Sequence, residues 1–364
     1  MLAFIKEEIS LLIALITLLF FKTGGAEYLA DGTPLAIYIP LSILLLGVVI
    51  WTIFGVVRHS DILAIRLGDP YGTLILTLSV ISLEVVMISS VMLTGDSNPT
   101  LARDTMFAVV MIISTGLVGL TLLLGGWRYH TQQFNLDGVK SYLVAIIPLA
   151  LVCLVLPNFT EGGSIGGLSV SMSWMLGLVS IMLYGIFLVI QTKSHSHFFV
   201  DADHLDDEHH HHASSHSNLY HGVLLLICLV TVMLLAKTLA MPINYSITTL
   251  GAPASLGGFL VACIILAPEA VGAIKAALNN QLQRAMNLYF GSVLATIALT
   301  VPAVLLVGSI AGEEVRLGLS PADMVLLVTT LMVCKVSFSS GRTHALHGAT
   351  HLVLFVVYLF LMFE

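Results

Sequence analysis

Two glutamates are the residues of this chain best suited to chemistry, because each stands near the middle of a long apolar segment. They are Glu84 and Glu269. A carboxylate at bilayer depth costs about 2.5–3.5 kcal/mol even on the mild insertion scale, and such residues mark ion pathways and proton relays. A carboxylate accepts either a proton or a metal cation, so the pair is predicted to bind cations and protons in turn. The alternative is a protonated glutamate that hydrogen-bonds between helices and serves packing.

The segments around the two glutamates read as copies of one element. When the chain is shifted by 185 positions, residues 72–86 fall on residues 257–271. Three pairs of identical residues then coincide, Gly72 with Gly257, Glu84 with Glu269, and Val86 with Val271. A rise of about 1.5 Å per residue places each glutamate about 20 Å along a core roughly 30 Å thick. In antiparallel helices, the two carboxylates would lie on either side of the midplane, within reach of a shared site.

Pro268 stands directly before the second glutamate and is predicted to kink its helix. A proline inside a helix has no N–H for the carbonyl four residues earlier, here that of Ile264. A freed carbonyl beside a carboxylate is a hard oxygen ligand of the kind that suits Ca²⁺ or Na⁺. The alternative is a kink that serves packing only.

Two further apolar segments carry hydroxyls, an amide and small residues at mid-span. These residues are predicted to complete an oxygen cage along the cation path, and the alternative is that they let helices approach closely. They are Ser114, Thr115, Asn287, Gly291, Ser292 and Thr296.

A polar loop spans residues 192–218, and its spacing of acids and histidines is irregular, unlike that of a structural zinc site. One interpretation is a solvated linker, and the other is a cytoplasmic segment that responds to cations or pH, since histidine titrates near physiological pH. The candidate residues are Asp201, Asp203, His204, Asp206, Asp207, Glu208, His209 and His210. Near the C-terminus, His344, His347 and His351 share one helical face, where they are either a metal site or histidines at the membrane rim.

The composition is that of an integral membrane protein. The chain has 364 residues, of which 57% are hydrophobic and 10% charged, and its mean hydropathy is +1.00. Soluble domains have about 25% charged residues. No basic block or aromatic–basic pattern favours nucleic acid, so none is expected as a partner. The four cysteines lie in apolar segments without paired spacing and predict no disulfide.

Eleven apolar runs approach the roughly 20 residues that cross a bilayer. The first, residues 9–21, is short enough to resemble a signal peptide, but acidic residues precede it and we predict a retained helix. The predicted spans are 8–22, 34–57, 71–93, 104–126, 141–157, 170–191, 219–241, 255–277, 286–311, 321–339 and 346–363.

The distribution of Lys and Arg predicts the orientation. With the N-terminus in the cytoplasm, ten of these residues fall on the inner side and four on the outer side, and cytoplasmic loops carry the excess. The C-terminus is then outside, and the loop between helices six and seven is cytoplasmic. Apart from the first helix, the spans divide into five plus five, and an odd number per half gives the two halves opposite orientations. We therefore predict an all-α membrane protein with an N-terminal helix (1–30), a first repeat (31–191), the polar loop (192–218) and an inverted second repeat (219–364). Transporters built this way bind their substrates at the midplane.

Segments 68–84 and 267–292 resemble the two alpha repeats of the calcium/cation antiporter superfamily, most closely its bacterial proton-coupled branch of ChaA-type Ca²⁺/H⁺ and Na⁺(K⁺)/H⁺ antiporters. The resemblance extends over nearly the whole chain. It implies an eleven-helix antiporter of the bacterial inner membrane in which Glu84 and Glu269 alternately bind cation and protons, with Ser292 near the cation path. Ile-Ser-Leu and Leu-Ala-Pro precede the two glutamates, where plant and fungal exchangers have Gly-Asn-Ala-Thr/Ala.

The function expected is export of Ca²⁺, and of Na⁺ or K⁺, in exchange for protons, without a cofactor and without enzymatic activity. One alternative is a Na⁺-driven Ca²⁺ exchanger that does not couple to protons. The other is an intramembrane hydrolase, which the absence of His-Glu-x-x-His and Gly-x-Ser-x-Gly disfavours. The physiological cation, the stoichiometry and the oligomeric state stay open.

Overall fold

The computed structural model describes residues 8–30, 32–67, 71–94, 99–160, 166–199, 216–249, 251–312 and 314–364. The acidic and histidine residues predicted in the loop, from Asp201 to His210, lie outside these ranges. Within α4, the side chains described are those of residue 75 and of residues 78–89.

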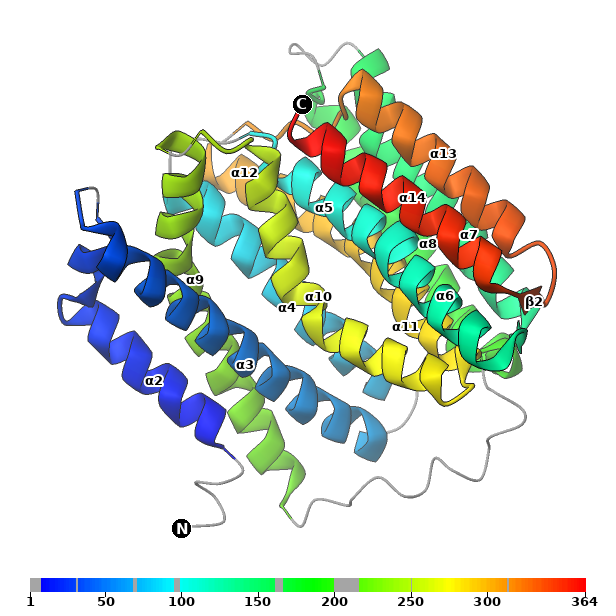
Figure 1. The fold of residues 1–364 in the computed structure, drawn as a ribbon, viewed down its shortest axis with the longest axis horizontal. Coiled ribbons are helices and arrows are strands. Elements are labelled where there is room, and N and C mark those ends of the chain that lie inside the picture. The colour runs from blue at the N-terminus through cyan, green and yellow to red at the C-terminus, as the bar shows by residue number, and fades with distance from the viewer. Residues whose placement is uncertain are drawn as a thin grey trace. The chain divides into compact units, whose positions relative to one another are not determined.

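The described chain is almost entirely helical (Figure 1). Each of the eleven predicted spans corresponds to one helix or one helix interrupted by a π-turn. The helices are α2 (Ile9–Lys22), α3 (Leu35–Leu67), α4 (Tyr71–Thr94), α5–η2–α6 (Leu101–Met111, Ile112–Leu117, Val118–Tyr129), α7 (Leu136–Leu154), α8–η4 (Val170–Val189, Ile190–Ser194), α9 (Asn218–Thr248), α10 (Ser255–Leu278), α11–η8–α12 (Leu282–Ala295, Thr296–Thr300, Val301–Ala311), α13 (Pro321–Ser337) and α14 (Ala345–Met362). Eight of the spans in this part of the chain are long and apolar enough to cross a membrane.

Several helices begin at a side chain that accepts from their free backbone amides. Asn135 caps α7, Ser169 caps α8, Ser217 caps α9 and Ser320 caps α13. These polar residues directly precede apolar runs, which is why the sequence located the starts of the helices within a few residues.

Two helices extend well beyond their predicted ends. α3 was expected to end at residue 57 but continues to Leu67, and α9 was expected to end at residue 241 but continues to Thr248. Hydropathy falls after residue 57 because Arg58 and His59 are polar, yet both side chains have partners inside the protein. Pro242 lies inside α9 and removes only one backbone donor.

Two π-turns interrupt helices at related places in the chain. η2 covers Ile112–Leu117 and η8 covers Thr296–Thr300, so their first residues are 184 positions apart, close to the offset between the two glutamates. π-turns are rare and occur mostly at functional sites. The sequence repeat is therefore accompanied by a repeated interruption of the helix that follows each glutamate helix.

The helices form two packing units. In the first packing unit, α3 packs against α2, α4 and α9, and α4 also packs against α9. The second packing unit contains α5–η2–α6, α7, α8, α10 from Gly258 onward, α11–η8–α12, α13 and α14. Each unit draws helices from both predicted repeats, and the repeat boundaries at residues 31, 192 and 219 remain predictions.

In the second packing unit, α6 and α14 lie side by side (Figure 1). A Cβ atom on Gly348 of α14 would stand 2.6 Å from the carbonyl oxygen of Gly119 on α6, so only glycine allows this approach. The ends of the two helices are joined by a short antiparallel ladder of β1 (Gln132–Gln133) and β2 (Arg342–Thr343), in which Gln132 faces Thr343. The helices are thus held backbone against backbone.

Candidate functional site

Glu84 lies on α4 in the first packing unit and is 1% exposed. Two serines on the preceding turns donate to backbone carbonyls four residues earlier. Ser82 Oγ donates to Leu78 O at 2.6 Å, and Ser79 Oγ donates to Ile75 O at 2.7 Å. These hydroxyls occupy the outer lone pairs of carbonyls in the turns before the carboxylate. The helix that carries Glu84 therefore keeps its backbone oxygens occupied.

Glu269 lies on α10 in the second packing unit and is half-buried, with Oε2 shielded from solvent. Pro268 is inside the same helix and is buried. Because proline has no N–H, the carbonyl of Ile264 lacks its usual helical donor. Ile264 is 3% exposed, so this carbonyl lies in the protein interior one turn before the carboxylate.

Contacts with the rest of the second packing unit hold α10 at both ends. At its start, a Cβ on Gly258 would lie 2.6 Å from the backbone nitrogen of Thr105, so α10 and α5 touch through backbone atoms. At its end, Tyr129 Oη donates to Leu278 O at 2.8 Å, and Gln132 Nε2 donates to Ala277 O at 2.9 Å. The turn that contains Pro268 therefore lies between two anchored ends of α10.

The predicted hydroxyls of the fourth span lie on η2 and are buried. Thr115 Oγ1 donates to Met111 O within its own helix. The carbonyl of Ser114 accepts from Nδ1 of His351 at 2.6 Å, and Nε2 of His351 is 3.0 Å from Ser337 Oγ. In a π-turn the regular i→i−4 pairing is broken, and His351 supplies a donor from α14 to a carbonyl of this turn.

His351 is 0% exposed, and both of its ring nitrogens already have protein partners. The rings of His344 and His347 lie 4.2 Å apart near the start of α14. Among the described residues, no group of three metal-binding side chains surrounds a common point, so the structure gives no support to a metal site of these three histidines.

The predicted residues of the ninth span lie on α11 and η8, and η2 packs against α11. Asn287 Nδ2 donates to Phe199 O at 2.5 Å, and its Oδ1 accepts from Gln283 at 2.8 Å. Asn287 thus anchors the chain at Phe199, which is a structural role. Ser292 is half-buried and Thr296 is buried. A Cβ on Gly291 would lie 3.7 Å from Tyr142 Oη, an ordinary contact.

Sequence reasoning missed Thr300, the last residue of η8. It is 0% exposed, and its Oγ1 has no hydrogen-bond partner in the described part of the chain. The offset of 185 positions places Thr115 on Thr300, so the repeat itself was the signal that could have found it. The two threonines occupy matching places in the two π-turns, but of the two hydroxyls only that of Thr115 has an acceptor among the described residues.

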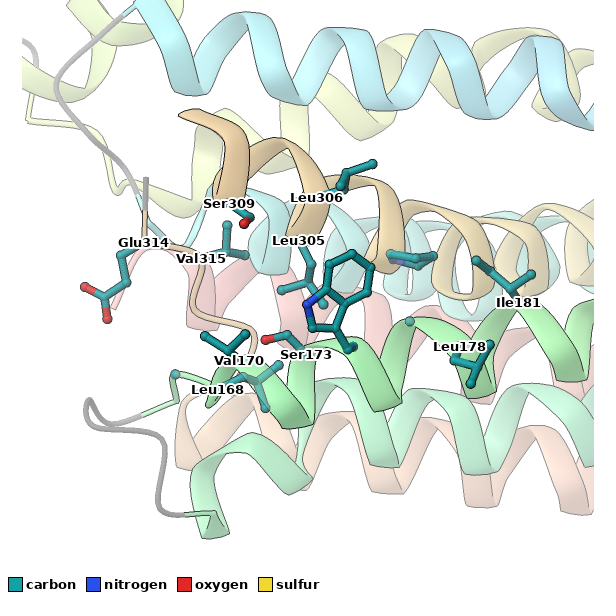
Figure 2. Close-up of a pocket in the computed structure, with 14 residues that line it drawn as sticks. Leu168, Val170, Ser173, Leu178, Ile181, Leu305, Leu306, Ser309, Glu314 and Val315 are labelled. Atoms are coloured by element: carbon teal, nitrogen blue, oxygen red, sulfur yellow. The ribbon is translucent and has the colours of Figure 1, made fainter. Parts of the chain in front are cut away.

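An apolar groove of about 430 Å³ lies elsewhere in the second packing unit, between α8 and α12 (Figure 2). Leu178 and Ile181 of α8 and Leu305 and Leu306 of α12 line it, and Glu314 lies at one end. Such a lining suits hydrocarbon better than a metal cation. The groove contains none of the residues predicted to bind ions.

Comparison with known proteins gives consistent matches in sequence and in fold. The family described as sodium/calcium exchanger protein matches residues 37–193 and 220–364. The sodium-potassium/proton antiporter ChaA of Escherichia coli K12 is 45% identical over 368 residues, covering 98% of this chain and 96% of the relative. The putative ionic transporter y4hA of Sinorhizobium fredii is 39% identical over 316 residues, covering 86% of each. The solved structure of YfkE, a Ca²⁺/H⁺ antiporter protein, has a TM-score of 0.74 at 18% identity, covering 97% of this chain and 99% of that one.

Proposed function

Because this chain belongs to the sodium/calcium exchanger protein family, we propose that it is a secondary active antiporter that expels Ca²⁺, and also Na⁺ or K⁺, in exchange for protons. The names of its relatives support the exchange with protons: one is a sodium-potassium/proton antiporter, and another of the same fold is a Ca²⁺/H⁺ antiporter. The chain is a multi-pass membrane protein whose partners are the lipid bilayer and the transported ions.

The proposed cycle uses Glu84 and Glu269 as the groups that change partners. As carboxylates they bind a cation from the cytoplasm, and after the protein changes its access, protons from outside neutralise them and the cation leaves. Two carboxylates balance one Ca²⁺ or two protons. If only a nearly neutral site can change its access, cation and proton movements are coupled.

The observation that carries this proposal is the placement of the two glutamates. Each lies in the interior of a helix, each has a carboxylate oxygen shielded from solvent, and the two are related by the repeat of 185 positions. A buried carboxylate in a membrane protein is costly and is retained where it binds an ion or a proton. The carbonyl of Ile264, left free by Pro268, is proposed as a further oxygen ligand. Ser114, Thr115, Ser292 and Thr296 are proposed to line the path.

The predicted location is the bacterial inner membrane, with the N-terminus and the loop between the sixth and seventh spans in the cytoplasm and the C-terminus outside. The bias of Lys and Arg supports this orientation.

Reconstituted vesicles with a pH-sensitive dye test the proposal. Ca²⁺, Na⁺ and K⁺ are added in turn, and each is expected to release protons from vesicles loaded at low pH. Glu84→Gln and Glu269→Gln each remove the charge at nearly constant shape, so each is expected to lower the rate at least about 100-fold. Glu314→Gln, at an exposed glutamate paired with Arg316, is the matched control and should keep the normal rate.

Two outcomes would contradict the proposal. Normal proton release by either glutamine variant would mean that the glutamates serve packing, since a glutamine keeps the shape and the hydrogen bonds. Ca²⁺ flux that follows a Na⁺ gradient and ignores a pH gradient in Na⁺-free buffer would show a Na⁺-driven exchanger instead.

A further inference from the structure

A cluster of ionisable residues, three of them buried and two half-buried, lies in the first packing unit, apart from the residues proposed for transport. It forms where the start of α2, the last third of α3 and the start of α9 meet. Its members are Glu8, Arg58, His59, Tyr220 and His221, here called the His59–His221 cluster. Glu8 is 2% exposed, His59 0% and His221 3%. Ionisable groups buried this far from water need partners, and these find them in one another.

The carboxylate of Glu8 joins the three helices. Its Oε2 lies 2.5 Å from Arg58 Nη2 and 3.2 Å from Nε2 of His59, and its Oε1 accepts from Tyr220 Oη at 3.0 Å. One negative charge thus faces a permanent cation and a titratable ring. The Nε2 atom of His59 is also 3.2 Å from Arg58 Nη2, so it either donates to the carboxylate or accepts from the guanidinium.

The two histidines meet through the same kind of atom. Nδ1 of His59 lies 3.0 Å from Nδ1 of His221. A hydrogen bond between two nitrogens holds one proton, so one ring donates and the other must be neutral with its lone pair free. An imidazolium ring carries protons on both nitrogens. The contact therefore survives with no added proton or with one, and a second added proton removes it.

The charges of the cluster also limit the histidine pair to one added proton. With one imidazolium, the cluster contains Arg58, one protonated ring and the carboxylate of Glu8. A second imidazolium adds a further positive charge in a site with little water, where charges repel strongly. Two N–H groups would then point at each other across the contact between α3 and α9.

A further positive charge lies beside the cluster. Arg66 of α3 donates to His216 O at 2.5 Å and to Asn218 Oδ1 at 3.0 Å, which adds positive charge near the start of α9. The ring of His216 stacks on Tyr220 at 4.3 Å. The remaining titratable groups with described side chains on α2, α3, α4 and α9 are Lys22, Tyr38, Asp61, Glu84, Cys228, Lys237 and Tyr245, and Asp61 is exposed.

We propose that the His59–His221 pair is a second proton-binding site, whose full protonation separates α3 from α9 at this end and slows transport. α4 packs against both α3 and α9, so the helix that carries Glu84 rests on the two helices that the pair joins. The inference rests on the proposed antiport and adds a regulatory proton that is not itself transported. On the predicted orientation, this site reports the pH of the cytoplasm.

The first test is the pH profile of the transport rate at saturating cation. Protons that compete for the transport glutamates raise the KM for the cation, whereas this site lowers the maximal rate. The maximal rate of the wild type is expected to fall on the acid side. In His221→Asn, the amide stands near the place of Nδ1 and keeps a hydrogen bond without titrating. The pH at which the maximal rate of this variant falls is expected to shift by about one unit or more, which is the usual spread of histidine pKa values in proteins.

His195→Gln is the matched control, because His195 is exposed and lies outside the cluster. Its profile should coincide with that of the wild type. An unchanged maximal-rate profile in His221→Asn would overturn the inference and leave the antiport itself intact. Absence of any exchange in the wild type would instead contradict the proposed function.

A second measurement follows the contact between α3 and α9 directly and does not depend on transport. A Cβ on Gly55 of α3 would lie 3.7 Å from the Sγ atom of Cys228 on α9 and 3.4 Å from Ser10 Oγ, so a cysteine fits there. In Gly55→Cys protein that keeps Cys228 and has its other three cysteines replaced by serine, a copper–phenanthroline oxidant should link residues 55 and 228. The linked peptides are quantified by mass spectrometry at pH 8 and pH 5.5.

Thiol reactivity falls with acid in every variant, so the ratio between variants is the readout. Acid is expected to lower the cross-linking rate several-fold more when His221 is present than in His221→Asn. An equal loss in both backgrounds would show that protonation does not separate α3 from α9 and would overturn the inference.

Discussion

In α4 the hydroxyls of Ser79 and Ser82 donate to carbonyls one turn before them, whereas in α10 the ring of Pro268 removes the donor that the carbonyl of Ile264 would have. The two glutamates stand at matching places in a repeat, yet one follows occupied carbonyls and the other follows an open one. The difference fits the proposal that both helices contribute a carboxylate and that α10 also contributes the backbone oxygen of Ile264.

The π-turns η2 and η8, in the helices that follow α4 and α10, also differ in how their polar atoms are hydrogen-bonded. In η2, His351 donates to the carbonyl of Ser114, and the hydroxyl of Thr115 donates to Met111 O. In η8, the hydroxyl of Thr300 has no acceptor in the described part of the chain. The two π-turns therefore differ, because the polar groups of Ser114 and Thr115 in η2 have protein partners, whereas the hydroxyl of Thr300 in η8 has none in the described part of the chain.

The largest expected effect tests the hydrogen bond from His351 to the carbonyl of Ser114 in η2. His351→Ala removes the partner of Ser114 O and of Ser337 Oγ, both in a buried region, and should lower the free energy of unfolding by about 2 kcal/mol. Thermal unfolding in detergent measures it. His347→Ala is the control, because Nδ1 of His347 has no hydrogen-bond partner among the described residues. An equal loss of unfolding free energy in both variants would contradict the role assigned to His351 at η2.

The next effect tests the carbonyl of Ile264, which lacks its helical donor because residue 268 is a proline. Pro268→Ala restores an N–H that can donate to Ile264 O, so a cation would lose one oxygen ligand. The KM for the cation is expected to rise about tenfold, which corresponds to about 1.4 kcal/mol. Pro148→Ala, inside α7 of the same packing unit, is the matched control and should leave KM unchanged. A rise in both variants would assign the effect to helix bending in general.

Paired threonine variants compare the two π-turns directly. Thr115→Val removes an internal hydrogen bond and should cost about 1 kcal/mol of stability. Thr300→Val removes a buried hydroxyl that has no hydrogen-bond partner among the described residues, so stability should not fall, while cation affinity should fall if this oxygen is a ligand. Unfolding curves and transport KM are measured for both. A loss of stability in Thr300→Val would show that its hydroxyl has a structural partner.

The smallest effect is expected in α4. Ser82 is exposed, and its hydroxyl only adds a second donor to a carbonyl that the helix already uses. Ser82→Ala should therefore change the KM for the cation by less than about threefold. A change as large as that of Pro268→Ala would erase the distinction between the two glutamate helices.

Hydropathy predicted the fold well because a membrane requires runs of about 20 apolar residues, and all eleven runs became helices. It failed at the end of α3, where the polar residues Arg58 and His59 contact partners distant in sequence, Glu8 and His221. Such pairings depend on which helices meet, and periodicity does not carry that information. The family was predictable from the repeat around the glutamates, and the match to residues 37–193 and 220–364 confirms it.

The candidate site was predictable only in part. The two glutamates and Pro268 were visible because charged residues and prolines are rare in apolar segments. The π-turns and the contact of His351 were not, since a helical interruption leaves no composition signal in a run such as Ile-Ile-Ser-Thr-Gly-Leu. Whether the predicted residues bind ions stays a prediction that the variants above test.

The contact of Gly119 with Gly348 has a consequence for how the protein moves. Helices separated by side chains can slide by exchanging rotamers, but α6 and α14 have no such layer at this crossing. Sliding would bring backbone atoms into steric clash, so the two helices must move together as one rigid unit. The ladder of β1 and β2 joins them at one end. Any rearrangement that exposes the ions to opposite sides must then pivot elsewhere.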